Sequence, residues 1–115
     1  MRILILDTER SAITKLKSYL AELDYVEQTE VFNRPEAMLA AYQQERPGMV
    51  FIRVGKPSLN GLQVARQVRE GDERAKLVFV ALNEDYAQYA HGVAVDYLIE
   101  PFELERFLEV MARAG

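Results

Sequence analysis

Charged side chains follow three apolar segments of this sequence at the point where each segment ends. Asp7 and Glu9 come directly after the first segment, Arg53 closes a central one and Glu100 follows the last. Carboxylates hold cations or act as nucleophiles, and a guanidinium forms two parallel hydrogen bonds with a carboxylate. We therefore expect an ion pair of Arg53 with Asp7, with Glu100 or with both. The alternative is that Arg53 extends its guanidinium into solvent.

The segments before these residues have the composition of buried β-strands. Short runs rich in apolar and β-branched residues alternate with stretches of helical period, which is typical of a parallel sheet covered on both faces. In an open doubly wound sheet the functional site lies at the carboxyl ends of the strands, so the charged residues should converge on one crevice. The predicted strands are Ile3–Leu6, Tyr25–Phe32, Met49–Val54, Leu77–Leu82 and Val95–Ile99.

Residue patterns place several individual elements. The segment Tyr25–Phe32 alternates polar and apolar residues, which predicts an edge strand. Asn33, shortly before Pro35, is a candidate helix N-cap. The last predicted helix runs over residues 104–111, and its predicted buried side consists of Phe107, Leu108 and Met111.

Composition limits the classes of function. The chain has 115 residues, enough for one domain over residues 1–115, and 28% of them are charged. A net charge of −4 argues against direct binding to nucleic acid, and the absence of cysteine excludes disulfides and thiolate metal sites. No apolar run approaches the roughly 20 residues that span a bilayer, and the first run is too short for a signal peptide, so we expect a cytoplasmic protein without membrane contact.

Four motifs, taken in order and spacing, resemble the receiver domain of bacterial response regulators over almost the whole chain. The resemblance implies a flavodoxin-like α/β fold of five βα units, with a parallel sheet in the order 2-1-3-4-5. The pattern of Tyr86, Tyr89, Ala90 and Asp96-Tyr97 further resembles that of receivers found upstream of LytTR-type DNA-binding domains. The matching stretches are residues 3–9, residues 50–65 with the turn at 57–62, residues 78–86 and residues 95–102.

The resemblance also assigns family positions to particular residues. Asp7 and Thr8 fall where the family has two acids that bind magnesium, and Arg53 falls where it has the phosphorylated aspartate. Ala81 takes the place of the hydroxyl residue that senses the phosphoryl group, and Glu100 that of the lysine. The bond from Glu100 to Pro101 matches a position at which receivers commonly have a cis peptide, so we expect cis there.

These replacements predict that the phosphorylation chemistry is lost. An aspartyl phosphate needs a carboxylate nucleophile and a metal ion that neutralises the transferred group, and Arg53 provides no carboxylate. We expect no metal, no cofactor and no enzymatic activity. Thr8 is predicted to cap the helix that begins near Glu9 rather than to bind a ligand, and a cation beside Asp7 and Glu9 is the less favoured alternative.

Aromatic residues define the second predicted functional region. Tyr97 matches the family's switch aromatic, and since Ala81 has no hydroxyl to move, we expect Tyr97 to hold one fixed position. The alternative is an ordinary half-exposed tyrosine at the sheet edge. Tyr86, Tyr89 and Phe102 are predicted near the same face, with at least one in the core, and His91 is predicted at the surface.

Several functional classes compete for this sequence. The sequence lacks the second Asp that a haloacid-dehalogenase-type phosphatase needs two residues after Asp7. Its first loop is acidic and lacks the small residues with which a flavodoxin-like protein binds a cofactor phosphate. The favoured function is a phosphorylation-incompetent receiver acting in signal transduction and transcription regulation. It would bind a protein partner or itself, with a homodimer plausible, through helix 4, strand 5 and helix 5. The alternative is a receiver-like sensor whose altered crevice binds a small molecule or a partner.

Overall fold

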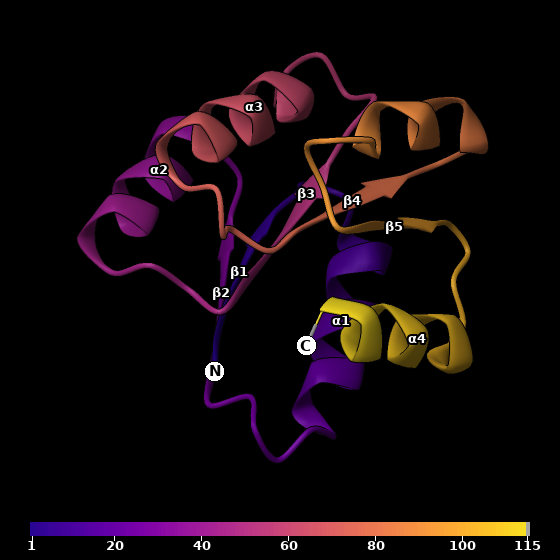
Figure 1. Cartoon of the computed structure of the whole chain (residues 1–115). Helices are drawn as coiled ribbons and strands as arrows, with labels where there is room; N and C mark the ends of the chain where they lie inside the picture. Colours follow the sequence, from indigo (N-terminus) through magenta and orange to yellow (C-terminus); the bar gives the residue numbers. More distant parts are fainter. Residues whose placement is uncertain (115) are drawn as a thin grey trace.

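Strands and helices alternate along the whole chain in the computed structural model, which describes residues 1–114 (Figure 1). The five strands are β1 (Arg2–Leu6), β2 (Gln28–Phe32), β3 (Met49–Arg53), β4 (Leu77–Ala81) and β5 (Asp96–Ile99). The helical elements are α1 (Arg10–Ala21), α2 (Pro35–Gln44), α3 (Gly61–Gly71), the 3-10 helix η1 (Glu84–Ala90) and α4 (Leu104–Ala114). The predicted α/β class is therefore confirmed.

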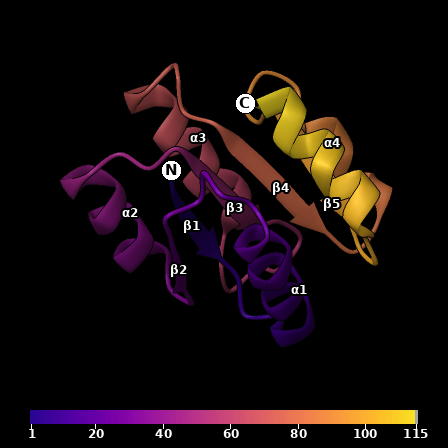
Figure 2. The same ribbon diagram turned by 90° about the horizontal axis from the view of Figure 1, so that it is seen from below.

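The strands form one parallel sheet in the order β2-β1-β3-β4-β5, as predicted (Figure 2). β2 lies at an edge, which also agrees with its polar alternation. The strand is shorter than predicted, because it begins at Gln28 rather than at Tyr25. Val26 donates its backbone N–H to the carbonyl of Leu23, so the chain is still turning after α1 at this point.

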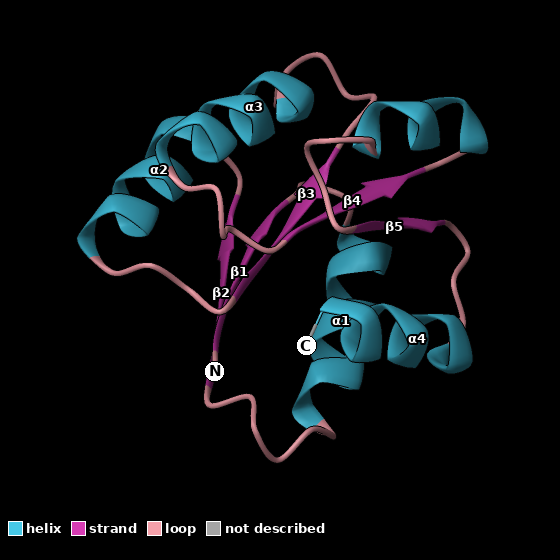
Figure 3. Ribbon diagram, in the orientation of Figure 1, coloured by secondary structure: helices cyan, strands magenta, loops and turns pink. Residues whose placement is uncertain are grey.

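Two hydrophobic cores cover the two faces of the sheet. Alternate residues of β1 point to opposite faces, with Ile3 and Ile5 packed beneath α1 and α4, and Leu4 and Leu6 beneath α2 and α3. Figure 3 shows these helices on either side of the strands. Every residue of β3 and β4 is buried, as expected for central strands of a sheet covered on both faces.

Three details of the helices differ from the sequence predictions. The segment after β4 is a 3-10 helix, opened by the Asn83 side chain, which accepts from the N–H of Asp85. Arg34, not Asn33, occupies the N-cap of α2, and its side chain makes no capping hydrogen bond. Helix α4 continues to Ala114, and Leu108 is 42% exposed because the buried face is centred on Phe107 and Val110.

Glycines allow the loop after β3 to turn back tightly beside the sheet. A Cβ atom at Gly61 would lie 1.9 Å from the carbonyl oxygen of Arg53, so only glycine fits there. Gly55 has a positive φ of 89°, and a Cβ on it would meet the ring of Tyr86 at 2.8 Å. The loop therefore presents Arg53 and the residues after it to the carboxyl edge of the sheet. Within residues 1–114, none of the helices has the length and apolarity needed to cross a bilayer.

Candidate functional site

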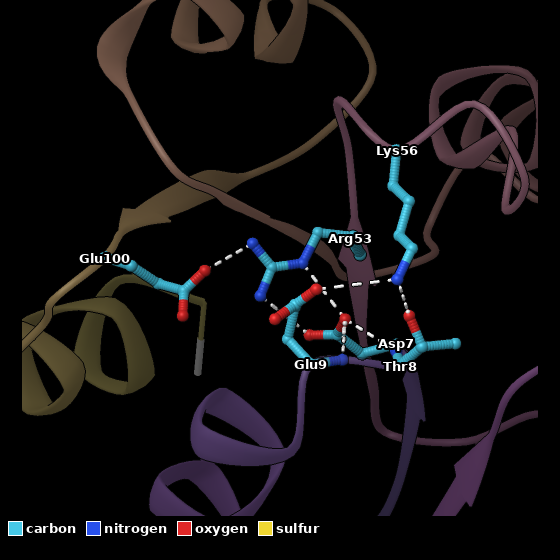
Figure 4. A network of polar contacts seen from close by, with 6 residues as sticks. All are labelled: Asp7, Thr8, Glu9, Arg53, Lys56 and Glu100. Carbon is cyan, nitrogen blue, oxygen red and sulfur yellow. Dashed lines mark hydrogen bonds and ion pairs between the residues drawn. The ribbon is translucent and has the colours of Figure 1, made fainter.

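The carboxyl ends of three strands bring a guanidinium between two carboxylates. Arg53 at the end of β3 donates from Nε to Asp7 Oδ1 and from Nη2 to Asp7 Oδ2, both at 3.0 Å. Its third nitrogen, Nη1, donates to Glu100 Oε2 (Figure 4). The Arg53 side chain is 3% exposed, Asp7 is 1% exposed and Glu100 is 15% exposed. Arg53 thus pairs with both acids and does not extend into solvent.

The carboxylate of Asp7 also holds the start of the following loop. Its Oδ1 accepts the backbone N–H groups of Thr8 at 2.7 Å and of Glu9 at 3.0 Å. Both carboxylate oxygens are therefore engaged by donors. The predicted capping role of Thr8 is wrong, because Glu9 is the N-cap residue of α1 and its side chain makes no capping hydrogen bond.

Lys56 joins this site, although the sequence analysis did not single it out. Its Nζ donates to Thr8 Oγ1 and lies 3.5 Å from Glu9 Oε1. Glu9 is consequently part of an ion pair that bridges the loops after β1 and β3. The sequence feature that could have indicated Lys56 is its position three residues after Arg53, which makes it a second basic residue near the end of the same predicted strand. Its side chain is 37% exposed, in contrast to the buried side chain of Arg53.

The charges of the site compensate one another internally. Asp7, Glu9 and Glu100 carry −3 and Arg53 with Lys56 carries +2, which leaves a net charge of −1. Burial lowers the pKa of Arg53, but hydrogen bonds and charge from Asp7 and Glu100 outweigh it, so the pKa lies above its ordinary value. Arg53 therefore remains a cation.

The remaining predicted site residues lie on β4, on β5 and directly after β5. Ala81 is buried at the end of β4 and pairs in register with Ile99, so it adds only apolar surface. The Glu100–Pro101 peptide bond is cis. Tyr97 is half-buried in β5, with the guanidinium carbon of Arg106 5.5 Å from its ring centroid.

The aromatic residues near the predicted interaction face have different environments. Phe102 is buried, whereas Tyr86 is half-buried and Tyr89 is exposed. The ring centroids of Tyr86 and Tyr89 are 6.3 Å apart. His91 is exposed, as predicted.

A crevice of about 300 Å³ adjoins the Arg53 cluster. Polar groups of Glu9, Lys56 and Asn83 line it, together with apolar surface from Pro57, Leu82 and Tyr86. Leu82 is 70% exposed, a high value for a leucine at the end of a central strand.

The residues present do not fit the magnesium ion that the fold implies. Magnesium needs free oxygen ligands in near-octahedral arrangement, and both oxygens of Asp7 already accept hydrogen bonds from Arg53. Among residues 1–114, no group of three His, Cys, Asp or Glu side chains is arranged to hold a metal ion. A guanidinium instead lies between the carboxylates.

The chain belongs to the response regulator receiver domain family, whose model matches residues 3–112. It is 29% identical over 116 residues to the sensory transduction protein LytT of Oceanobacillus iheyensis, covering 98% of this chain and 47% of LytT. It is 31% identical over 118 residues to the positive alginate biosynthesis regulatory protein of Pseudomonas aeruginosa, covering 100% of this chain and 47% of that protein. The chain thus spans about half the length of these curated relatives.

Other relatives match along nearly their whole length. The chemotaxis protein CheY of Listeria monocytogenes is 24% identical over 118 residues, covering 100% of this chain and 98% of CheY. Among solved structures, the response regulatory domain of mrkE from Klebsiella pneumoniae has a TM-score of 0.87 at 21% identity, over 99% of this chain and 94% of that one. The response regulator TrrA from Thermotoga maritima, in complex with Mg(2+)-BeF, has a TM-score of 0.85 at 22% identity, over 99% and 98%. These structures agree with the fold described above.

Proposed function

We propose that this receiver domain of a two-component response regulator works without phosphorylation and signals through contacts with other protein surfaces. The observation that carries the proposal is the buried ion pair of Arg53 with Asp7 and Glu100. Arg53 takes the family's phosphoacceptor position, Glu100 the lysine position, and Ala81 the hydroxyl position.

The contacts of Asp7 support the loss of phosphoryl transfer. Asp7 is the one carboxylate left from the family's phosphorylation site, and its Oδ1 accepts from Arg53, Thr8 and Glu9 while its Oδ2 accepts from Arg53. A nucleophile must point a free lone pair at phosphorus, and a metal must neutralise the transferred group. In this domain the place for a metal is taken by the guanidinium.

The proposed contact surface is formed by η1, β5 and α4, the segments that correspond to helix 4, strand 5 and helix 5 of the family. Tyr89 on η1 and Val95, just before β5, are exposed, and Tyr97 on β5 is half-exposed. Exposed aromatic and apolar groups of this kind favour a protein interface. The partner is a second copy of the domain or another protein, and regulation of transcription would run through that partner or through a further domain.

Light scattering across a concentration series, with and without magnesium and acetyl phosphate, tests the proposal. We expect the solution mass to be the same in both conditions, and intact mass spectrometry to find no phosphoryl adduct. A dimer indifferent to the reagents supports self-association, and a monomer in every condition directs the search to a heterologous partner. A phosphorylated aspartate, or dimerisation induced by the reagents, contradicts the proposal.

A further inference from the structure

A second buried ionic cluster lies at the outer edge of β5. Asp96, whose side chain is 1% exposed, accepts from Arg106 Nη2 at 2.9 Å and faces Arg113 Nη1 at 3.4 Å. Both arginines come from α4, which packs behind the strand. Asp96 Oδ2 receives no hydrogen bond within the described chain, so Arg113 contributes an ion pair but Arg106 makes the directed contact.

Arg106 and Asp96 together use both main-chain polar groups of Tyr97. The Tyr97 N–H donates to Asp96 Oδ1 at 2.8 Å, and the Tyr97 carbonyl accepts from Arg106 Nη2 at 2.7 Å. β5 is the last strand of the sheet, so its main-chain groups that do not face β4 have no strand partner within residues 1–114. The two side chains therefore close the middle of this exposed edge, which would otherwise be free to pair with another strand.

Arg106 also holds the side chain of Tyr97. Its guanidinium carbon lies 5.5 Å from the centroid of the Tyr97 ring, within the range of a cation–π interaction. A planar guanidinium is able to face the ring while its N–H groups donate to Asp96 and to the Tyr97 carbonyl, whereas a lysine ammonium has no comparable plane. One side chain of α4 thus contacts the ring and the backbone of Tyr97 simultaneously.

We propose that Arg106 is a positioning residue that locks Tyr97 and the outer edge of β5 in a single arrangement, independently of the Arg53 site. The cluster around Asp96 and the cluster around Arg53 share no residue. The contacts of Arg106 with Asp96 and Tyr97 therefore hold the surface of β5 and α4 in one conformation, whatever changes occur at the carboxyl ends of β1 and β3. This role of Arg106 goes beyond the proposed function and does not depend on it.

The test measures Tyr97 directly in isotope-labelled full-length chain by NMR, in four variants. Arg106→Ala should shift the ring signals of Tyr97 and speed amide exchange at Tyr97 by about tenfold, with Leu98 unchanged. Arg106→Lys retains the charge without the plane and should restore only part of the wild-type ring shift. Arg113→Ala is the matched control, because it removes the other cation of Asp96 without touching Tyr97, and Arg53→Ala tests independence.

The proposal is overturned if Arg106→Ala and Arg113→Ala have the same effect on Tyr97, or if Arg106→Lys restores the wild-type spectrum fully. It is also overturned if Arg106→Ala speeds exchange equally at Tyr97 and Leu98, because that would indicate a general loss of stability in β5. The independence of the two clusters is overturned if Arg53→Ala shifts the ring signals of Tyr97 as much as Arg106→Ala does. If the domain were phosphorylated, the proposed function would be wrong, but these NMR measurements would still test the role of Arg106. The two proposals can therefore fail separately.

Discussion

The two buried ionic clusters of this domain are opposite in charge and in construction. In one, the cation Arg53 lies between two carboxylates that directly follow other strands, 46 and 47 residues away in sequence. In the other, the anion Asp96 faces two arginines of the next helix, one of them 10 residues away. Arg53 and both partners are largely desolvated, whereas Arg106 and Arg113 are 31% and 65% exposed.

This difference in solvation should separate the energetic roles of the clusters. A buried charge that loses its partner is costly, because neither water nor another group replaces the lost interaction. An exposed partner is replaced by water and dissolved ions at little cost. We therefore expect the Arg53 cluster to determine global stability and the Asp96 cluster to act more locally.

The largest effect is expected from Arg53→Ala, which leaves the carboxylates of Asp7 and Glu100 without their shared cation. The free energy of unfolding should fall by about 3–5 kcal/mol, measured by urea denaturation. Adding Asp7→Ala should cost less than the sum of the single changes, since it removes one uncompensated carboxylate. A loss of no more than about 0.5 kcal/mol, which is typical of surface ion pairs, would contradict the expectation that the Arg53 cluster determines global stability.

The second effect concerns the anion of the other cluster. Asp96→Asn keeps the size of the side chain but removes the charge that faces Arg106, and should lower the free energy of unfolding by about 2 kcal/mol. Arg113→Ala should change it by less than about 0.5 kcal/mol, because Arg113 is mostly exposed. Equal losses of stability in Asp96→Asn and Arg113→Ala would mean that the exposure of a charged side chain does not determine how much stability its removal costs.

The hydrogen bond between Tyr42 and Asp72 pairs a neutral donor with a carboxylate. We expect its contribution to stability to be smaller than that of the Arg53 cluster and to depend on pH. The buried Tyr42 hydroxyl donates to Asp72 at 2.7 Å, which lowers the pKa of Asp72 below 3.8, while burial and Asp72 raise the pKa of Tyr42 above 10.0. Tyr42→Phe should cost about 1 kcal/mol near neutral pH. The Asp72 contribution is present above its unfolded pKa and is lost as the pH falls through the lowered folded pKa.

The Tyr42 contribution has the opposite sign of pH dependence. It is present below pH 10.0 and is lost as the pH rises through the raised folded pKa of Tyr42. The stability difference between wild type and Tyr42→Phe should therefore narrow in acid below pH 3.8 and in alkali above pH 10.0. Denaturant titrations of both proteins at several pH values measure this difference in the free energy of unfolding. A difference that does not change with pH would show that the Tyr42 hydroxyl does not interact with the charge of Asp72.

The smallest effect is expected at Lys56, an exposed residue that contacts the loop after β1. Lys56→Ala removes exposed contacts with Thr8 and Glu9 and should change the free energy of unfolding by less than about 0.5 kcal/mol. The remaining difference should disappear in high salt, where exposed ion pairs are screened. A larger, salt-independent loss would place Lys56 in the same energetic class as Arg53.

The sequence by itself determined the fold and the location of the site. Five apolar segments alternating with helical periods define a parallel α/β sheet, and the carboxyl-end rule is enough to bring Asp7, Arg53 and Glu100 together. The order of the strands followed from the resemblance to receiver domains. These features depend on hydrophobic burial and chain connectivity, which local sequence patterns express directly.

Only the tertiary structure decided which groups contact one another. Arg53 pairs with both acids rather than one, Thr8 accepts from Lys56 rather than capping α1, and Asp96 faces two arginines of α4. Leu108 is exposed because the precise rotation of α4 on the sheet selects Val110 for the core. These contacts depend on side-chain direction and on approaches of a few ångströms between segments distant in sequence, which periodicity does not specify.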